Sequence, residues 1–372
     1  MNKKLLLLAI MLLSMTGVAM GAEIKINETN FPDAKFREWL MEQSYGEDGM
    51  LTEAEIAEVT EIGVSYNDIT SLKGIEFFIA LTELDCSTNQ LTALDVSKNL
   101  SLTKLDCSTN QLTVLDVSKN LSLTELYCTD NQLTVLDVSK NTSLKGLACG
   151  YNKLTVLDVS KNTSLIDLRC SANQLTVLDV SKHTSLTELS CSSNELAVLD
   201  VSKILPLTEL DCGYNNLTVL DVSKNLSLTK LDCTNNQLTS VDVSKNTSLT
   251  ILSCGYNQLT ALDVSKNLSL TELSCGSCQL TVLDVSKNTV LESLYCFSNK
   301  LTSLDASKNT ALRELVCTNN QINEREMSKL IDSLPTVTEG NCMLKRNSDD
   351  EQNVLTEELK AKAQKKGWTE NE

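Results

Sequence analysis

The sequence contains a single histidine, and this scarcity limits the chemistry that the protein can perform. Hydrolytic sets of the Ser-His-Asp or Cys-His type need an imidazole, and His183 would have to supply it. Its neighbours Lys182 and Thr184 are ordinary residues of a repeated motif described below, so nothing around it is specialised. We therefore expect no catalytic set and no enzymatic activity.

Long apolar runs are also scarce. The one present, residues 5–13, follows two lysines and is too short to cross a bilayer. Ala19-Met20-Gly21 then resembles a cleavage site, which completes the pattern of a secretory signal peptide over residues 1–21. We expect a protein that is secreted or held at the cell surface, with the periplasm as an alternative, and that does not insert into a membrane.

Positive charge is the third scarcity, because 32 basic residues face 49 acidic ones and the formal net charge is −17. A field of this sign disfavours binding to nucleic acids and to anionic lipids, and it favours solubility. We expect neither a nucleic-acid partner nor a cofactor.

What the sequence does contain is a 21-residue repeat, for example LTKLDCSTNQLTVLDVSKNLS over residues 102–122. Self-similarity at a fixed short period is the signature of a solenoid, in which each coil stacks on the coil before it. One cysteine marks each repeat. The twelve cysteines of this series are Cys86, Cys107, Cys128, Cys149, Cys170, Cys191, Cys212, Cys233, Cys254, Cys275, Cys296 and Cys317.

Each repeat consists of two similar halves. In residues 81–101, Leu84 and Cys86 of the first half match Leu94 and Val96 of the second half. Apolar residues two apart point to the same side of an extended segment, so both pairs would face the core. We predict an α/β solenoid of parallel β coils, with short strands on the side of the cysteines (the Cys side) and also on the opposite side (the Val side).

The repeat resembles a known family. The leucine-rich repeat pattern LxxLxLxxNxL is met by Leu102, Leu105, Cys107, Asn110 and Leu112. More narrowly, the 21-residue period with a cysteine in the third apolar slot is similar to the internalin J-like group of bacterial extracellular proteins. The resemblance implies a leucine-rich repeat array that serves extracellular recognition, often adhesion, without catalysis.

The two ends of the array need caps, because a terminal coil would otherwise expose its apolar edge to water. We assign residues 22–60 to an N-terminal helical cap, 61–322 to the leucine-rich repeat solenoid, and 323–372 to a C-terminal αβα cap. In the first cap, Thr52 and Glu55 have the spacing of a capping box. In the last, Trp368 is predicted to cover the final coil.

Residues 44–55 partly match a calcium-binding EF-hand loop. Asp48 and Glu55 fall on positions five and twelve of an EF-hand loop, but Ser44 and Gly46 occupy positions one and three, where acidic ligands normally lie. Calcium needs about six oxygen ligands, and this loop supplies few strong ones. We favour a helix–turn–helix cap, with the calcium loop as the alternative and no other metal site.

The cysteine column allows three interpretations. Exported proteins often form disulfides, but cysteines in register lie about 4.8 Å apart and point the same way, which does not suit disulfide geometry. Metal-binding thiolates would have to converge, which a linear stack does not allow. We favour burial as small apolar side chains. The CxxC pair of Cys275 and Cys278 arises because Cys278 replaces a repeated asparagine, and we expect no redox role.

Stacked coils also place identical polar residues in columns. One asparagine per repeat, such as Asn110 or Asn131, lies where the chain must turn, and its amide can satisfy backbone groups there. On the other flank an aspartate column runs beside a lysine column, as in Asp116 and Lys119, and we expect the two charges to offset each other. These columns are predicted to be scaffold.

Recognition should therefore use the positions that vary between repeats. On the Cys side the outward residues are those three and one before each cysteine and one after it, and all aromatics of the regular array lie there or in the adjoining turn. Tyrosine offers a large contact area with few rotatable bonds. The candidate ligand-binding residues are Tyr127, Tyr151, Arg169, Tyr214, Tyr256, Tyr295 and Phe297. For the three tyrosines in CGYN strings the alternative is that they shield the turn and spread by repeat duplication.

These observations predict an exported binding or adhesion module that recognises an extracellular protein or glycan, for example on a host cell or in mucin, through the Cys-side strand face. We expect it to be a monomer. Two alternatives remain open: a passive envelope or structural repeat protein, and an accessory protein of a glycan-degrading system.

Overall fold

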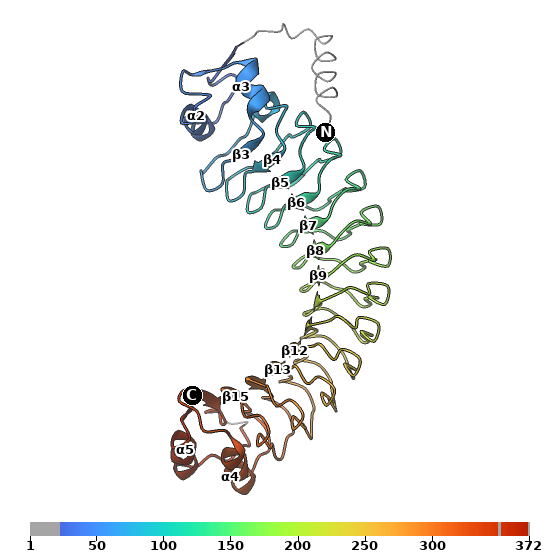
Figure 1. The fold of residues 1–372 in the computed structure, drawn as a ribbon, viewed down its shortest axis with the longest axis vertical. Coiled ribbons are helices and arrows are strands. Elements are labelled where there is room, and N and C mark those ends of the chain that lie inside the picture. The colour runs from blue at the N-terminus through green and yellow to red at the C-terminus, as the bar shows by residue number, and fades with distance from the viewer. Residues whose placement is uncertain (1–22, 349–350, 371–372) are drawn as a thin grey trace. The chain divides into compact units, whose positions relative to one another are not determined.

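The computed structural model describes residues 23–348 and 351–370, and the predicted signal peptide lies outside them. The chain divides into two compact units, residues 1–154 and 155–372. In both units the 21-residue repeats form stacked coils, each with one short strand (Figure 1). Within the described residues, no helix has the length and apolar character needed to cross a membrane.

The first unit begins with a small cap and continues as a parallel sheet. The strand pair β1 and β2 is antiparallel, and β3 to β7 then lie in chain order with their residues in matching register. The elements are β1 (Ile24–Lys25), α2 (Ala34–Met41), β2 (Met50–Leu51), α3 (Glu53–Glu58), β3 (Glu61–Gly63), the 3-10 helix η2 (Ile75–Phe77), β4 (Glu83–Asp85), β5 (Lys104–Asp106), β6 (Glu125–Tyr127) and β7 (Gly146–Ala148).

The second unit is a longer array with a mixed cap at its C-terminal end. Strands β8 to β17 follow one another in chain order within a parallel sheet. The elements are β8 (Asp167–Arg169), β9 (Glu188–Ser190), β10 (Glu209–Asp211), β11 (Lys230–Asp232), β12 (Ile251–Ser253), β13 (Glu272–Ser274), β14 (Ser293–Tyr295), β15 (Glu314–Val316), α4 (Glu324–Ser333), β16 (Gly340–Met343), α5 (Glu357–Gln364) and β17 (Trp368–Glu370).

The predicted capping box is present at the start of α3. The Thr52 hydroxyl accepts a hydrogen bond from the Glu55 backbone N–H, and the Glu55 carboxylate accepts one from the Thr52 N–H at 2.8 Å. The other candidate calcium ligand, Asp48, accepts from the Met50 N–H at 2.9 Å. Both carboxylates therefore serve the local backbone, and residues 23–348 and 351–370 hold no group of three or more His, Cys, Asp or Glu that could bind a metal ion.

The cysteines form a buried column, as the packing interpretation predicts. All fourteen cysteines, including Cys342 of the C-terminal cap, are free and buried. Burial raises the pKa of the Cys149 thiol to about 12, because a thiolate would lose its hydration in the core. The thiols are thus held in their neutral, unreactive form.

Thiol reactivity provides a direct test of this column. We expect a thiol reagent to label almost none of the fourteen cysteines in the folded protein and all of them after unfolding, since burial blocks both access and ionisation. Mass spectrometry of the two labelled samples measures this. Cysteines that stay unlabelled after unfolding without reductant would indicate disulfides and contradict the packing interpretation.

The predicted strands on the Val side are wrong, because no strand forms there in the described residues. The backbone carbonyls that a ladder would need have other partners. The Val96 carbonyl accepts from the Asn99 N–H at 3.0 Å and from the Asn120 side-chain amide at 3.0 Å. A tight turn and a buried amide thus replace the strand ladder, although Val96 faces the core as expected.

The asparagine column next to the cysteines is scaffold, as predicted. The Asn215 amide donates to the carbonyls of Cys191, Cys212 and Gly213 at 3.0, 3.1 and 3.1 Å, and its oxygen accepts from the Leu196 N–H at 3.0 Å. The column continues into the C-terminal cap, where Asn353 repeats this pattern. Sequence analysis missed Asn353, because it lies outside the 21-residue period.

A second asparagine column lies on the Val side, and His183 interrupts it. Asparagines of this column donate to two carbonyls of preceding coils, as Asn246 does to Val222 and Asn225 at 3.0 and 2.8 Å. His183 is 0% exposed, and its Nε2 contacts a single carbonyl, that of Val159, at 3.1 Å. The histidine thus occupies an asparagine position of the column and makes one backbone hydrogen bond where an asparagine makes two.

Replacing His183 by asparagine is expected to raise the free energy of unfolding by about 1 kcal/mol, because the amide can reach two carbonyls where the imidazole reaches one. The denaturation midpoint in urea measures this. The reverse change in the same column, Asn246→His, serves as the control and should lower the midpoint. A lower midpoint for His183→Asn would contradict this role.

Trp368 is buried within the C-terminal segment that follows the repeats. This side chain is 1% exposed and its indole N–H donates to the Pro335 carbonyl at 2.8 Å. The structure adds an element that the sequence did not reveal, because residues around Trp368 form β17 and pair in parallel with β16.

Candidate binding surface

The outward side chains of the Cys-side strands form the candidate surface. Each strand has three residues, of which the central leucine is buried, so the first and third side chains point outward. Because all strands share one register, these side chains lie in two columns. Together with the side chains of the turns that directly follow the strands, these columns make up the strand face, which is longest in the second unit.

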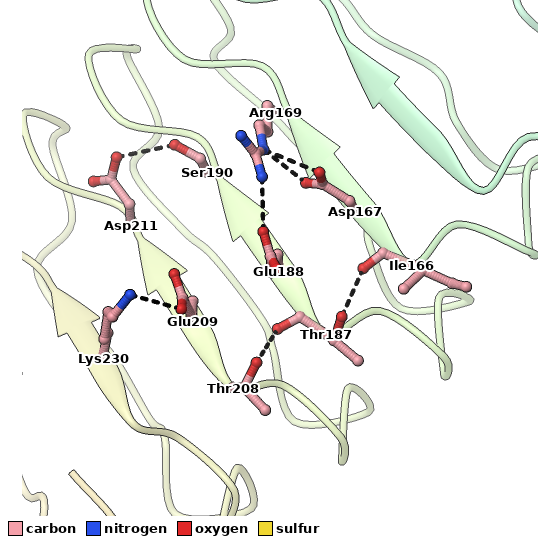
Figure 2. Close-up of polar contacts among 10 residues, drawn as sticks. All are labelled: Ile166, Asp167, Arg169, Thr187, Glu188, Ser190, Thr208, Glu209, Asp211 and Lys230. Atoms are coloured by element: carbon pink, nitrogen blue, oxygen red, sulfur yellow. Dashed lines mark hydrogen bonds and ion pairs between the residues drawn. The ribbon is translucent and has the colours of Figure 1, made fainter. Parts of the chain in front are cut away.

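Two cations of the strand face are held by neighbouring carboxylates (Figure 2). The Arg169 guanidinium contacts Asp167 of its own strand at 3.0 Å and Glu188 of the next strand at 2.8 Å. Lys230 reaches back to Glu209 at 2.8 Å. Such exposed pairs stabilise a fold by less than about 1 kcal/mol each. The structure thus places the candidate Arg169 on the surface, but with its charge already matched.

Asp211 and Asp232 differ from the paired carboxylates above. They occupy adjacent positions in the third-residue column, and no cation of the strand face pairs with them. Asp211 accepts hydrogen bonds from the hydroxyls of Ser190 and Ser192 at 2.9 and 2.7 Å. Asp232 accepts from the Thr234 N–H at 2.8 Å. Burial raises the pKa of Asp232, and the nearby charge of Asp211 raises it further. No ion pair in the described part of the chain involves either carboxylate.

These side chains border a depression of about 360 Å³ on the strand face. Its lining combines charged groups with the central leucines of the strands. The lining residues are Asp167, Arg169, Glu188, Leu189, Ser190, Glu209, Leu210, Asp211, Lys230, Leu231, Asp232, Ile251 and Ser253. Apart from Arg169, sequence analysis did not select these residues, although their even spacing places them in adjacent columns.

A threonine column supports the lower edge of this region. The Thr208 hydroxyl donates to the Thr187 carbonyl at 3.0 Å, and Thr187 donates to Ile166 at 3.2 Å (Figure 2). These bonds satisfy carbonyls at the start of each strand. The threonines are therefore scaffold, and they leave the outward columns as the variable part.

An aromatic pair lies farther along the same unit. The rings of Tyr256 and Phe297 meet edge to face with centroids 5.9 Å apart. The Phe297 ring covers Gly276, where an added Cβ would lie 2.6 Å from the ring atom Cε1. Gly276 is thus required for this packing. Tyr256 remains 50% exposed, so the pair presents an apolar platform to solvent.

The other candidate aromatics are less clustered. Tyr295 projects from β14, where burial and a hydrogen bond with Glu314 raise its pKa to about 12. Tyr127 projects from β6 of the first unit and donates to Glu125 at 3.1 Å. Tyr151 and Tyr214 are exposed at turn positions with φ of 51° and 53°. The structure therefore brings Tyr256 into contact with Phe297, whose coil also carries Tyr295, across the intervening coil of Gly276. Of the other aromatic candidates, Tyr127 and Tyr151 lie on adjacent coils of the first unit.

The opposite flank is scaffold, but not for the reason expected from charge. Asp221 accepts a hydrogen bond from the Ser223 N–H at 2.8 Å. Hydrogen bonds from the Ser223 backbone and hydroxyl lower the pKa of Asp221, and the charge of Lys224 has a smaller effect. The aspartate column thus closes turns, rather than mainly offsetting the lysines.

The CxxC pair belongs to the core. The Cys278 thiol takes the place of the repeated asparagine and donates weakly to the Cys254 carbonyl at 3.6 Å. Burial raises its pKa. This environment does not favour the reactive thiolate of a redox site.

Comparison with solved structures identifies the family. InlJ from Listeria monocytogenes, whose functional domain includes a cysteine ladder, has a TM-score of 0.75 and 36% sequence identity, with 88% of this chain and 77% of that chain covered. The chain belongs to the internalin family of leucine-rich repeat proteins.

Two further structures show the same fold. The internalin InlF from Listeria monocytogenes has a TM-score of 0.68 and 24% identity, covering 90% of this chain and 95% of that one. A leucine-rich repeat protein from Leptospira interrogans has a TM-score of 0.64 and 25% identity, covering 75% and 84%. The LVIVD repeat family matches only residues 170–193, and no curated protein matches the chain.

Membership of the internalin family of leucine-rich repeat proteins supports a general role in protein binding or adhesion. Such proteins are typically secreted or held at the cell surface. Neither the ligand nor the face that contacts it follows from the similarity.

Proposed function

We propose that this protein is an exported binding or adhesion module that presents the strand face of its second unit to an extracellular protein or glycan. The observation that carries the proposal is that different columns of side chains serve different purposes. The leucines and cysteines fill the core, and the asparagines, the threonines and the aspartates of the Val side form hydrogen bonds with the backbone. The strand face is where side chains vary and remain available.

Two features of this face support recognition. The depression around Asp211 offers charged groups at fixed positions. The platform of Tyr256 and Phe297 offers a partly exposed apolar surface, with the Phe297 ring packed against Gly276. Aromatic residues on a rigid support are typical of the centres of binding interfaces, since little conformational entropy is lost when they are covered.

The test is a binding screen with the chain from residue 22 onward, against an array of glycans and a panel of host surface proteins that includes mucin. We expect at least one saturable ligand whose binding is lost when the strand face is altered. If the folded protein binds nothing saturably, a passive envelope protein becomes the better account. If it binds only polysaccharides that a companion enzyme degrades, an accessory role in glycan degradation does.

A further inference from the structure

We infer that the partner of the strand face is a basic protein segment, rich in lysine or arginine, that docks across strands β8 to β15. The inference rests on the proposed function, because it specifies the chemistry of the ligand that this face would bind.

The charge of the strand face is strongly unbalanced. Its outward positions on β8 to β15 carry seven carboxylates and two cations. The carboxylates are Asp167, Glu188, Glu209, Asp211, Asp232, Glu272 and Glu314, and the cations are Arg169 and Lys230. The two cations pair with Asp167, Glu188 and Glu209. Four carboxylates are left without a cation of their own.

Two of these four carboxylates line the depression, and the other two lie on the strands beside the candidate residue Tyr295. Asp211 and Asp232 line the depression. Glu272 and Glu314 lie on β13 and β15, on either side of the strand that carries Tyr295. A lysine or arginine could bind a carboxylate with its charged end and cover an aromatic ring with its apolar stem or its charge. Few other groups suit both features.

The same charges argue against other partners. An anionic glycan would be repelled by a face with five more carboxylates than cations, and a neutral glycan would gain nothing from that excess. A basic protein would be steered toward it and would relieve the repulsion between Asp211 and Asp232, which are adjacent in register. Charge complementarity therefore favours a protein over a glycan.

The matched test uses two pairs of substitutions in the same two coils. The first variant, Asp211→Asn with Asp232→Asn, removes two charges from the strand face. The second, Asp221→Asn with Asp242→Asn, removes two charges from the Val side, where an asparagine can still accept the turn hydrogen bond from serine. Both variants have the same net charge, and neither removes a buried apolar group.

The probe is a fluorescent ten-residue peptide that alternates lysine and threonine, with a peptide that alternates glutamate and threonine as control. Fluorescence anisotropy measures the dissociation constants at about 20 mM and about 150 mM salt, on either side of the range where surface charges become screened. We expect the lysine peptide to bind, and the strand-face variant to weaken binding about 10-fold. The Val-side variant should change it less than about 2-fold, because its charges are remote from the peptide.

Two results would overturn the inference. Equal weakening by both variants would mean that the peptide responds to net charge alone. Absence of binding to the unaltered protein would mean that the face does not take basic segments. In either case, the proposed function would still stand if the binding screen yields a ligand whose binding depends on Tyr256, Tyr295 and Phe297. If the lysine peptide does not bind and the screen yields no such ligand, the proposed function is wrong as well.

Discussion

Replacing Asn215 by alanine is expected to lower the free energy of unfolding by about 4 kcal/mol, a large effect for one substitution. The side chain makes four buried hydrogen bonds, and alanine would leave three carbonyls and one N–H without that partner. Each such buried group costs about 1–3 kcal/mol, and relaxation of the turn recovers part of the sum. Because coils contact mainly their neighbours, the loss should centre on the coils around β10.

The control is the next residue in the chain, Asn216, which is exposed and makes a single long contact with Gln237 at 3.3 Å. Asn216→Ala should change the free energy of unfolding by less than about 0.5 kcal/mol. Urea denaturation followed by circular dichroism measures both variants. Similar midpoints for the two alanine variants would contradict the structural role of the asparagine column.

Replacing Tyr256, Tyr295 and Phe297 together by alanine is expected to weaken binding of the screened ligand more than about 100-fold. The three side chains lie on two coils of the strand face, those of Cys254 and Cys296, and are at least partly exposed. Their removal takes away the apolar platform without opening the leucine core. The unfolding midpoint should therefore change little while the dissociation constant changes greatly, and surface plasmon resonance measures the latter.

A matched control exists on the Val side. Val177, Val198 and Val219 are 70, 74 and 71% exposed, and their replacement by alanine also removes apolar surface from three coils of the same unit. This control should bind the ligand as the unaltered protein does. Loss of binding in the valine variant, with normal binding in the aromatic variant, would move the binding surface to the other flank.

Much of the fold could be predicted because the period determines the register. A constant spacing of 21 residues places Leu210 between Leu189 and Leu231 in the sheet, so one coil describes the next. The same logic predicted the burial of the cysteines and the turn role of the first asparagine column. Capping at Thr52 was recognisable because both hydrogen-bonding partners lie within one helical turn.

The errors arose where one residue pattern fits two geometries. Alternation at Leu94 and Val96 predicts that both face the core, but it does not decide whether their carbonyls bond to a neighbouring strand or to an asparagine side chain. Asp221 and Lys224 have a spacing that suits an ion pair. Ser223 lies between them, and its N–H donates to the Asp221 carboxylate and closes the turn.

The candidate site was predictable in part. Its aromatic residues could be selected from the sequence because they lie at positions that vary between repeats. The contact between Tyr256 and Phe297 could not be predicted, because the Phe297 ring reaches past the coil of Gly276. The unpaired state of Asp211 and Asp232 also depends on which carboxylates Arg169 and Lys230 select. Such choices are made between neighbouring side chains in space and leave no periodic signal in the sequence.

The measurement that tests the account most directly is hydrogen–deuterium exchange of the protein with and without the ligand from the screen. We expect slower exchange in the turns that follow strands β10 to β14, which adjoin the depression and the aromatic pair. The Val-side segments that carry Asp221 and Asp242 should exchange unchanged. Protection of those segments, with the strand-face turns unaffected, would contradict the division between scaffold and recognition columns.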